Sequence, residues 1–192
     1  LPFALSNPEV FCDHPYDVRK APKDQYFSLS WVAAQSDSEG TALLFDRPSA
    51  FVGSKDQATL EVVLGYGGQF IYAPNETISL SGTHSFKFAI VSFAGTWEKA
   101  QIPQLAEEFL HPLLCYEGSV GVQQVEPLIR LEPEEAVFLG ALYKKGEALI
   151  VRLFNPYTDT RTVSLIVPGL KKAWESDLFG KPIKPLTSSR EG

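Results

Sequence analysis

The stretch from Ala136 to Leu178 decides the fold, and its centre is the run Ala148-Leu149-Ile150-Val151-Arg152-Leu153-Phe154-Asn155-Pro156. A second apolar run precedes it, Val137-Phe138-Leu139-Gly140-Ala141-Leu142-Tyr143, and the two are separated by Lys144-Lys145-Gly146-Glu147. Two β-prone runs joined by a short loop that contains glycine predict a β-hairpin. Pro156 has no backbone N–H to donate to a ladder, so we expect the second strand to end near Asn155.

Neither strand of this hairpin alternates cleanly between apolar and polar residues. Near-continuous apolar strands are expected when both faces are covered, or when one face is core and the other meets another domain. The following stretch, Thr160 to Val167, does alternate, with Val163, Leu165 and Val167 on one face. We interpret these three strands as the centre of a terminal β-module.

Upstream of the hairpin, alternation at two-residue spacing predicts four further strands. They cover 25–33, 41–46, 58–64 and 83–93. The first has Phe27, Leu29 and Trp31 on one face, and the last has Phe86, Phe88, Ile90 and Ser92 on one face. One short helix is predicted over 103–110, because apolar residues recur there at helical spacing between Pro103 and Pro112.

The predicted organisation has four parts. Residues 1–24, punctuated by four prolines, form an irregular segment or linker, and residues 25–116 form a first β-sandwich portion that includes the helix. After a polar connection over 117–125, residues 126–186 form the terminal portion, with short strands at 127–131, 171–178 and 183–186, and 187–192 is a loose tail. Strands with turn signals between them predict a mainly β chain, an antiparallel β-sandwich with one short helix.

Composition excludes several classes of partner. The 192 residues carry a net charge of −6, which argues against nucleic acid and against an anionic membrane surface. The sequence contains no run of about 18 apolar residues, so no membrane span is predicted. Cys12 and Cys115 have no metal-like spacing, and we expect reduced, inert thiols in a cytoplasmic protein, although pairing in an exported one stays open. The chain starts at Leu1 and contains no methionine, which predicts a fragment or a processed product, and a fragment can lack the catalytic part of its parent.

No catalytic residue, metal ligand or cofactor site is predicted in this chain. His14, His84 and His111 share no metal-ligand spacing, and no nucleophile elbow of the Gly-x-Ser-x-Gly type is present. The glycines at 65, 67 and 68 lack the Lys and the following helix of a phosphate-binding loop.

Three residues are candidates for contact with a sugar or an adjoining domain. Arg152 lies in the middle of an apolar strand, where it either lays its stem along the sheet or meets a neighbouring domain. Trp97 and Trp174 could stack on a sugar ring if exposed. Trp31 alternates with core positions, and we expect it to be buried.

Several phrases, taken in order, resemble the C-terminal β-sandwich region of glycoside hydrolase family 38, the α-mannosidases. The matching phrases are 27–32, Asp37, 40–46, 82–89, 95–97, 106–113, 140–144, 149–156 and 174–178, so the resemblance spans roughly Gln25 to Leu186. The chain departs from the pattern at Leu64-Gly65-Tyr66, where many relatives have Leu-Leu-Arg, so no sugar-facing Arg is carried over there.

The resemblance implies a galactose mutarotase-like sandwich and a parent enzyme that hydrolyses α-mannosides with retention, using zinc and an Asp nucleophile. Those groups belong to an upstream catalytic barrel and a helical domain, which become the expected partners, with a mannoside as ligand. We therefore expect a non-catalytic domain that supports the barrel and walls the sugar site. A free-standing carbohydrate-binding module and a protein-interaction β-sandwich are the alternatives.

Overall fold

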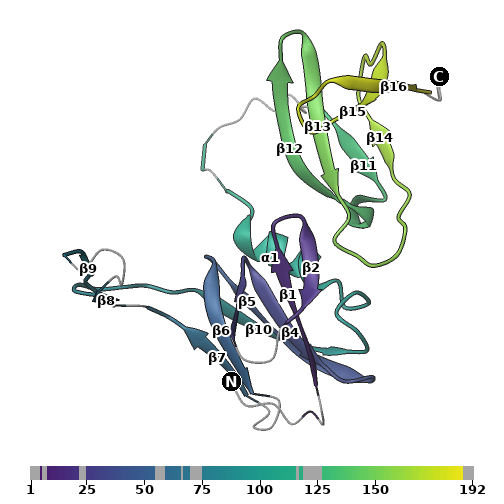
Figure 1. Cartoon of the computed structure of the whole chain (residues 1–192). Helices are drawn as coiled ribbons and strands as arrows, with labels where there is room; N and C mark the ends of the chain where they lie inside the picture. The colour runs from purple at the N-terminus through teal and green to yellow at the C-terminus, as the bar shows by residue number, and fades with distance from the viewer. Residues whose placement is uncertain are drawn as a thin grey trace. The chain divides into compact units, whose positions relative to one another are not determined.

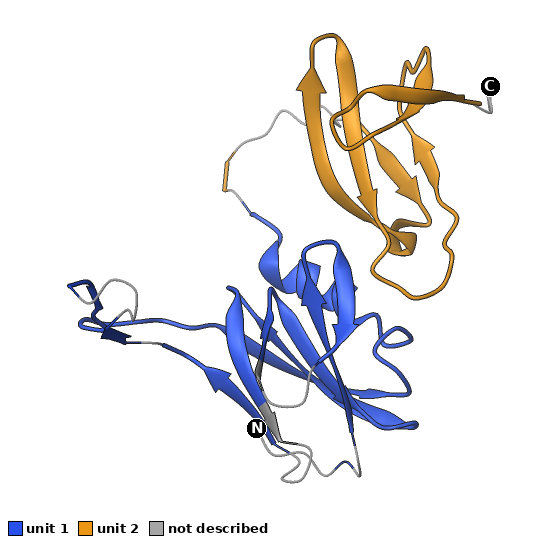
Figure 2. Ribbon diagram, in the orientation of Figure 1, with its two compact units in different colours: residues 1–116 blue, residues 117–192 orange. Residues whose placement is uncertain are grey.

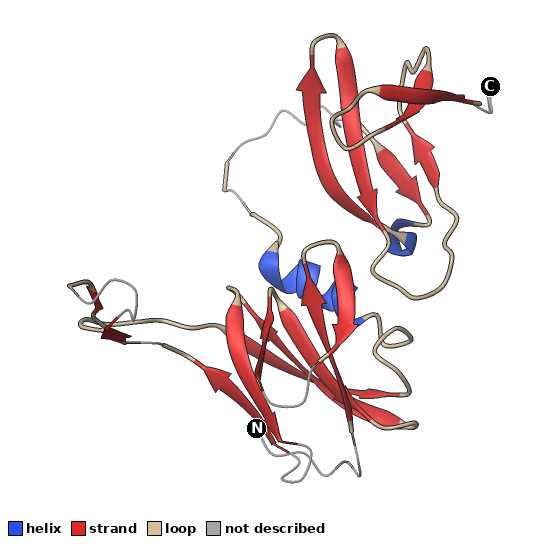
Figure 3. Ribbon diagram, viewed as in Figure 1, coloured by secondary structure: helices blue, strands red, loops and turns tan. Residues whose placement is uncertain are grey.

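The computed structural model describes residues 5, 8–21, 25–54, 59–65, 67–69, 75–115, 117–118 and 127–187. The chain divides into two compact units, unit 1 from Leu1 to Tyr116 and unit 2 from Glu117 to Gly192 (Figure 2). The described residues are mainly β-strand with a short helix, which confirms the predicted fold class (Figure 3).

Unit 1 is built mainly from a larger and a smaller antiparallel sheet (Figure 1). The larger has the order β10-β5-β4-β1-β2 and is built from β1 (Glu9–His14), β2 (Asp17–Lys20), β4 (Trp31–Gln35), β5 (Glu39–Phe45) and β10 (Phe88–Ala94). The smaller has the order β3-β6-β7 and is built from β3 (Gln25–Ser28), β6 (Ser49–Ser54) and β7 (Thr59–Val63). Two residue pairs join β8 (Gly68–Gln69) to β9 (Thr77–Ile78).

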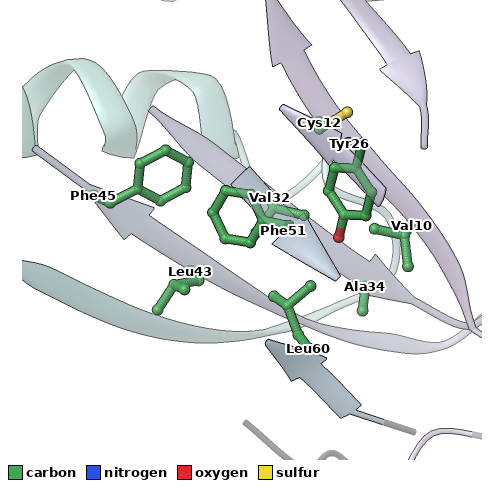
Figure 4. Packing of buried hydrophobic residues seen from close by; sticks show 9 residues of the cluster. All are labelled: Val10, Cys12, Tyr26, Val32, Ala34, Leu43, Phe45, Phe51 and Leu60. Atoms are coloured by element: carbon green, nitrogen blue, oxygen red, sulfur yellow. The ribbon is translucent and has the colours of Figure 1, made fainter. Parts of the chain in front are cut away.

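The core of unit 1 lies between these two sheets, as a β-sandwich requires. Alternate residues of the larger sheet meet Tyr26, Phe51 and Leu60 of the smaller one (Figure 4). Phe51 is the centre of an aromatic group, with ring centroids 4.9 Å from Phe45 and 5.6 Å from Tyr26. The contributors from the larger sheet are Val10, Cys12, Val32, Ala34, Leu43 and Phe45.

The other face of the larger sheet is covered by Trp97 and by α1 (Ile102–Leu110). The ring of Trp97 lies 5.4 Å from that of Trp31, and its backbone N–H donates to Oε1 of Gln35 at 2.8 Å. All five residues of β4 are buried because both of its faces are covered. The helix predicted over 103–110 and the burial of Trp31 are both confirmed.

The prediction for residues 1–24 is wrong where the structure describes them. Val10 and Cys12 point into the core from β1, which pairs with both β2 and β4. The prolines lie beside the strands: Pro8 precedes β1, and Pro15 lies in the turn to β2. Two buried residues in a six-residue strand are too short a pattern to stand out from the sequence.

Two predicted strands also differ from the structure. The stretch 25–33 divides into β3 and β4, so Phe27 and Leu29 are exposed whereas Trp31 is buried. In the stretch 83–93 only Phe88 onward is strand, and the face that carries Phe88, Ile90 and Ser92 is its more exposed one. β6 was not predicted at all.

Unit 2 consists of three antiparallel strand pairs. The pairs join β11 (Arg130–Glu132) to β14 (Ser164–Ile166), β12 (Phe138–Lys145) to β13 (Ala148–Phe154), and β15 (Ala173–Ser176) to β16 (Pro182–Leu186). The predicted hairpin is confirmed as β12–β13, with a two-residue turn at Gly146 (φ 59°) and Glu147. β14 pairs with β11 rather than joining the hairpin, which corrects the predicted three-stranded centre. The tail from 188 and most of the 117–125 connection lie outside the described residues.

Candidate functional site

The three histidines have different surroundings. His14 Nε2 lies 3.7 Å from Cys12 Sγ, and His111 follows α1 with its ring 3.5 Å from the Glu107 carboxylate. His84 is exposed. Within the described ranges, no group of three or more His, Cys, Asp or Glu side chains could hold a metal ion.

Cys12 is buried in the sandwich core, where its thiol is chemically quiet. Burial, followed by the neighbouring Asp13 carboxylate, raises the pKa of Cys12 from 9.0 to about 11. A thiol with a raised pKa stays protonated at neutral pH, and the thiolate is the reactive form. Cys115 is exposed, and the two cysteines are not paired.

Asp13 carries the densest polar contacts in the described part of unit 1, and sequence reasoning missed them. Its carboxylate accepts the backbone N–H groups of Leu29 (2.8 Å), Ser30 (3.0 Å) and Trp31 (3.3 Å). It also accepts the hydroxyl groups of Ser28 and Ser30. The chain crosses from the smaller sheet to the larger between β3 and β4, and Asp13 satisfies the amides freed by that crossing. We infer a structural role for Asp13.

Trp97 is withdrawn as a candidate for stacking on a sugar. Its exposed fraction is 1%, and the rings of Phe11 and Trp31 lie against its own. Trp174 on β15 is 48% exposed and so remains available. The two tryptophans differ because residues that are distant in the sequence bury Trp97 and do not bury Trp174.

The apolar strands of unit 2 are largely uncovered. No residue of β12 or β13 is buried, although both strands have the near-continuous apolar sequence of a covered sheet. The buried apolar residues described in this unit are Ala136, Val137, Pro156 and Tyr157. Its exposed large apolar residues include Leu139, Leu142, Tyr143, Leu149, Leu153, Leu165, Leu170, Trp174, Leu178, Phe179, Ile183 and Leu186. Within unit 2 neither face of the hairpin is fully covered, and the alternative, contact of one face with another domain, stays a prediction.

Arg152 reaches from the middle of β13 to the turn that joins β15 to β16. Its Nη2 donates to the backbone carbonyl of Leu178 at 3.2 Å. Lys145, at the end of β12, donates its ammonium to the next carbonyl, that of Phe179. Two cations from the central hairpin therefore hold two consecutive carbonyls of a turn that is distant in sequence.

That turn, Asp177 to Lys181, is hereafter the 177–181 turn. Oδ1 of Asp177 accepts the backbone N–H of Phe179 at 2.9 Å and of Lys181 at 2.8 Å. The backbone of Asp177 also accepts from Gly180 N–H at 2.9 Å and donates to the Lys181 carbonyl at 3.0 Å. Gly180 has φ 76°, a left-handed conformation that favours glycine. The turn is thus fixed by its own residues and by Lys145 and Arg152.

At the tip of the fixed turn, Leu178 is 78% exposed and Phe179 is 82% exposed. A turn usually carries small or polar residues at such positions. This site has no arrangement for breaking bonds. What the arrangement can do is present two apolar side chains on a backbone that hydrogen bonds hold in place.

No protein-family model matches the chain, and no curated protein matches it. No helix in the described part of the chain has the length and apolarity needed to cross a membrane.

Proposed function

We propose that this chain is a non-catalytic β-sandwich domain of an α-mannosidase-like glycoside hydrolase, in which it supports the catalytic barrel and walls one side of the sugar site. The observation that carries the supporting role is the uncovered apolar sheet of unit 2. The link to α-mannosidases depends on the ordered sequence phrases alone.

The energetics of unit 2 favour a covering surface. Burying an exposed Leu or Phe side chain completely contributes about 1.5–3 kcal/mol, and unit 2 leaves many such side chains in water. Exposed apolar patches larger than a few hundred Å² usually mark interaction sites. A permanent partner that covers β12 and β13 would recover this energy.

Unit 1 has a smaller uncovered area of the same kind. Ile90 on β10 pairs with Leu43 on β5, and Leu43 faces the core. Ile90 is nevertheless 59% exposed, and Phe88 on the same face is 40% exposed. The smaller sheet does not cover the β10 edge of the larger sheet, which supports a second contact area with the parent.

The test uses this chain together with the remainder of its reading frame, expressed as a separate polypeptide. Alone and with added zinc, the chain should not hydrolyse an aryl α-mannoside. Added to the remainder, it should raise the thermal midpoint of that polypeptide. Turnover by the chain alone that a chelator abolishes would overturn the non-catalytic assignment. If the chain leaves the thermal midpoint of the remainder unchanged, the supporting role is overturned.

Trp174 favours a second candidate, a carbohydrate-binding module. Its ring is half-exposed on β15, and aromatic rings stack on the apolar faces of sugars. Titrating Trp fluorescence with mannose oligomers, on the wild type and on Trp174→Phe, tests this candidate. A saturable change that the variant lacks would support it, whereas a flat response would remove it.

A further inference from the structure

The 177–181 turn combines two properties that rarely occur together. Its backbone is held by hydrogen bonds from Asp177, Lys145 and Arg152, yet the side chains of Leu178 and Phe179 are almost fully exposed. Ordering an interface residue on binding costs entropy, and a residue that is already fixed avoids this cost. Rigid, bulky apolar anchors that enter a pocket are typical of the centre of a protein interface.

We propose that the 177–181 turn is the docking anchor of unit 2, which inserts Leu178 and Phe179 into an apolar pocket rimmed by carboxylates on a neighbouring protein domain. This inference rests on the proposed function, since it names the part of unit 2 that binds the parent. It also gives Arg152 a role. Arg152 is a positioning residue, which fixes the Leu178 carbonyl and thereby the direction of the anchor.

The charges around the turn select the chemistry of the pocket. Lys145, Arg152 and Lys181 lie in or against the turn, and Asp177 is the carboxylate within it. Its Oδ1 already accepts two backbone N–H groups. The anchor therefore has a positive surround, and a complementary partner places carboxylates around the pocket that receives Phe179.

An anionic membrane surface could also attract apolar side chains with a basic surround, but the net charge of the whole chain favours a protein. The chain has a net charge of −6, which opposes approach to an anionic bilayer.

The experiment measures binding of the chain to the separately expressed remainder of its reading frame by calorimetry. Phe179→Ser and Leu178→Ser should each weaken binding at least tenfold. Leu170→Ser is the matched control, because Leu170 is an exposed apolar residue (45%) on a different turn, and it should stay within about twofold of the wild type. Raising NaCl from about 50 to 500 mM should weaken wild-type binding several-fold, because the carboxylate rim is screened.

Arg152→Gln has its own readout in the free chain. Backbone N–H exchange at Gly180 and Lys181 should accelerate when the guanidinium no longer holds the Leu178 carbonyl, whereas Arg161→Gln should leave both positions unchanged. Equal exchange in Arg152→Gln and the wild type would overturn the positioning role.

The remaining outcomes separate the two proposals. Tight binding that Phe179→Ser does not weaken would overturn the anchor and leave the supporting role intact. Binding that salt does not weaken would overturn the carboxylate rim. The absence of any binding would overturn both proposals. If the chain floats with vesicles of phosphatidylserine and phosphatidylcholine and Phe179→Ser abolishes this, the partner of the anchor is a membrane and the protein pocket is overturned.

Discussion

The Asp13 carboxylate on β1 accepts both the backbone N–H and the side-chain hydroxyl of Ser30, with Oδ2 lying 3.0 Å from N and 2.6 Å from Oγ. Seventeen residues separate the partners. The contact fixes the corner at which the chain passes from one sheet of the sandwich to the other, so unit 1 depends on a polar group that composition and periodicity do not reveal.

Asp13→Ala should destabilise unit 1 by about 2–4 kcal/mol, because it leaves the amides of Leu29, Ser30 and Trp31 without their acceptor. Urea unfolding followed by far-ultraviolet circular dichroism measures this loss. Asp37→Ala is the control, since Asp37 is exposed in the β4–β5 turn. If both variants lose equally little stability, the corner does not need the carboxylate.

Gly40→Ala should destabilise unit 1 by about 1–3 kcal/mol through overpacking. A methyl group there would lie 2.2 Å from the Phe93 ring and 2.9 Å from the Ala34 carbonyl oxygen. Gly118→Ala is the control, because its added carbon meets nothing within 4 Å. Thermal unfolding of the two variants gives the comparison, and Phe93→Leu should recover part of the loss in Gly40→Ala. A Gly40→Ala chain as stable as the wild type would contradict this packing.

Trp97→Ala should cost about 3–5 kcal/mol of stability, whereas Trp174→Ala should cost less than about 1 kcal/mol. The first change empties a site between the helix and the larger sheet, and the second removes a side chain that is 48% exposed. Chemical denaturation, followed by the fluorescence of the remaining tryptophans, measures the loss of unfolding free energy in each variant. Equal losses would show that the two side chains are not buried as differently as the structure indicates.

The two cysteines should react at very different rates with an aromatic disulfide at pH 8. Cys115 is exposed and should react within minutes, whereas Cys12 should react only after denaturant is added, because its thiol is buried and its pKa is about 11. Counting released thiolate in the folded and the unfolded chain measures this, with Cys115→Ser as the control that removes the fast phase. Two fast thiols would contradict the buried position of Cys12.

Cys12 also predicts a dependence of stability on pH. Its pKa is raised on folding, so the protonated thiol stabilises the fold below pH 9, and this contribution is lost as the pH rises from about 9 to 11. Cys12→Ser should therefore flatten the decline of unfolding free energy across that window, and Cys115→Ser should leave it unchanged. If the unfolding free energy of Cys12→Ser declines as steeply as that of the wild type, the decline arises from other groups. Tyr26 is one such group, because burial also raises its pKa.

The sequence by itself determined the local features of this protein. The β class, the β12–β13 hairpin with its turn at Gly146 and the helix beginning beside Pro103 all follow from residues that are neighbours in the chain. Turn chemistry and periodicity act over a few residues, so they can be read from one sequence.

Only the tertiary structure decided which face of each strand is covered and which distant groups meet. Alternation in β10 gave the correct period, whereas the exposure of Phe88 and Ile90 depends on the smaller sheet, which does not cover that edge. The sequence did not distinguish the exposure of Trp97 from that of Trp174, because exposure depends on neighbours that are distant in the chain. The partner of Arg152, the Leu178 carbonyl, lies 26 residues away. Such contacts depend on how separate elements pack, and packing energy arises between residues whose spacing in the sequence has no fixed relation to their distance in space.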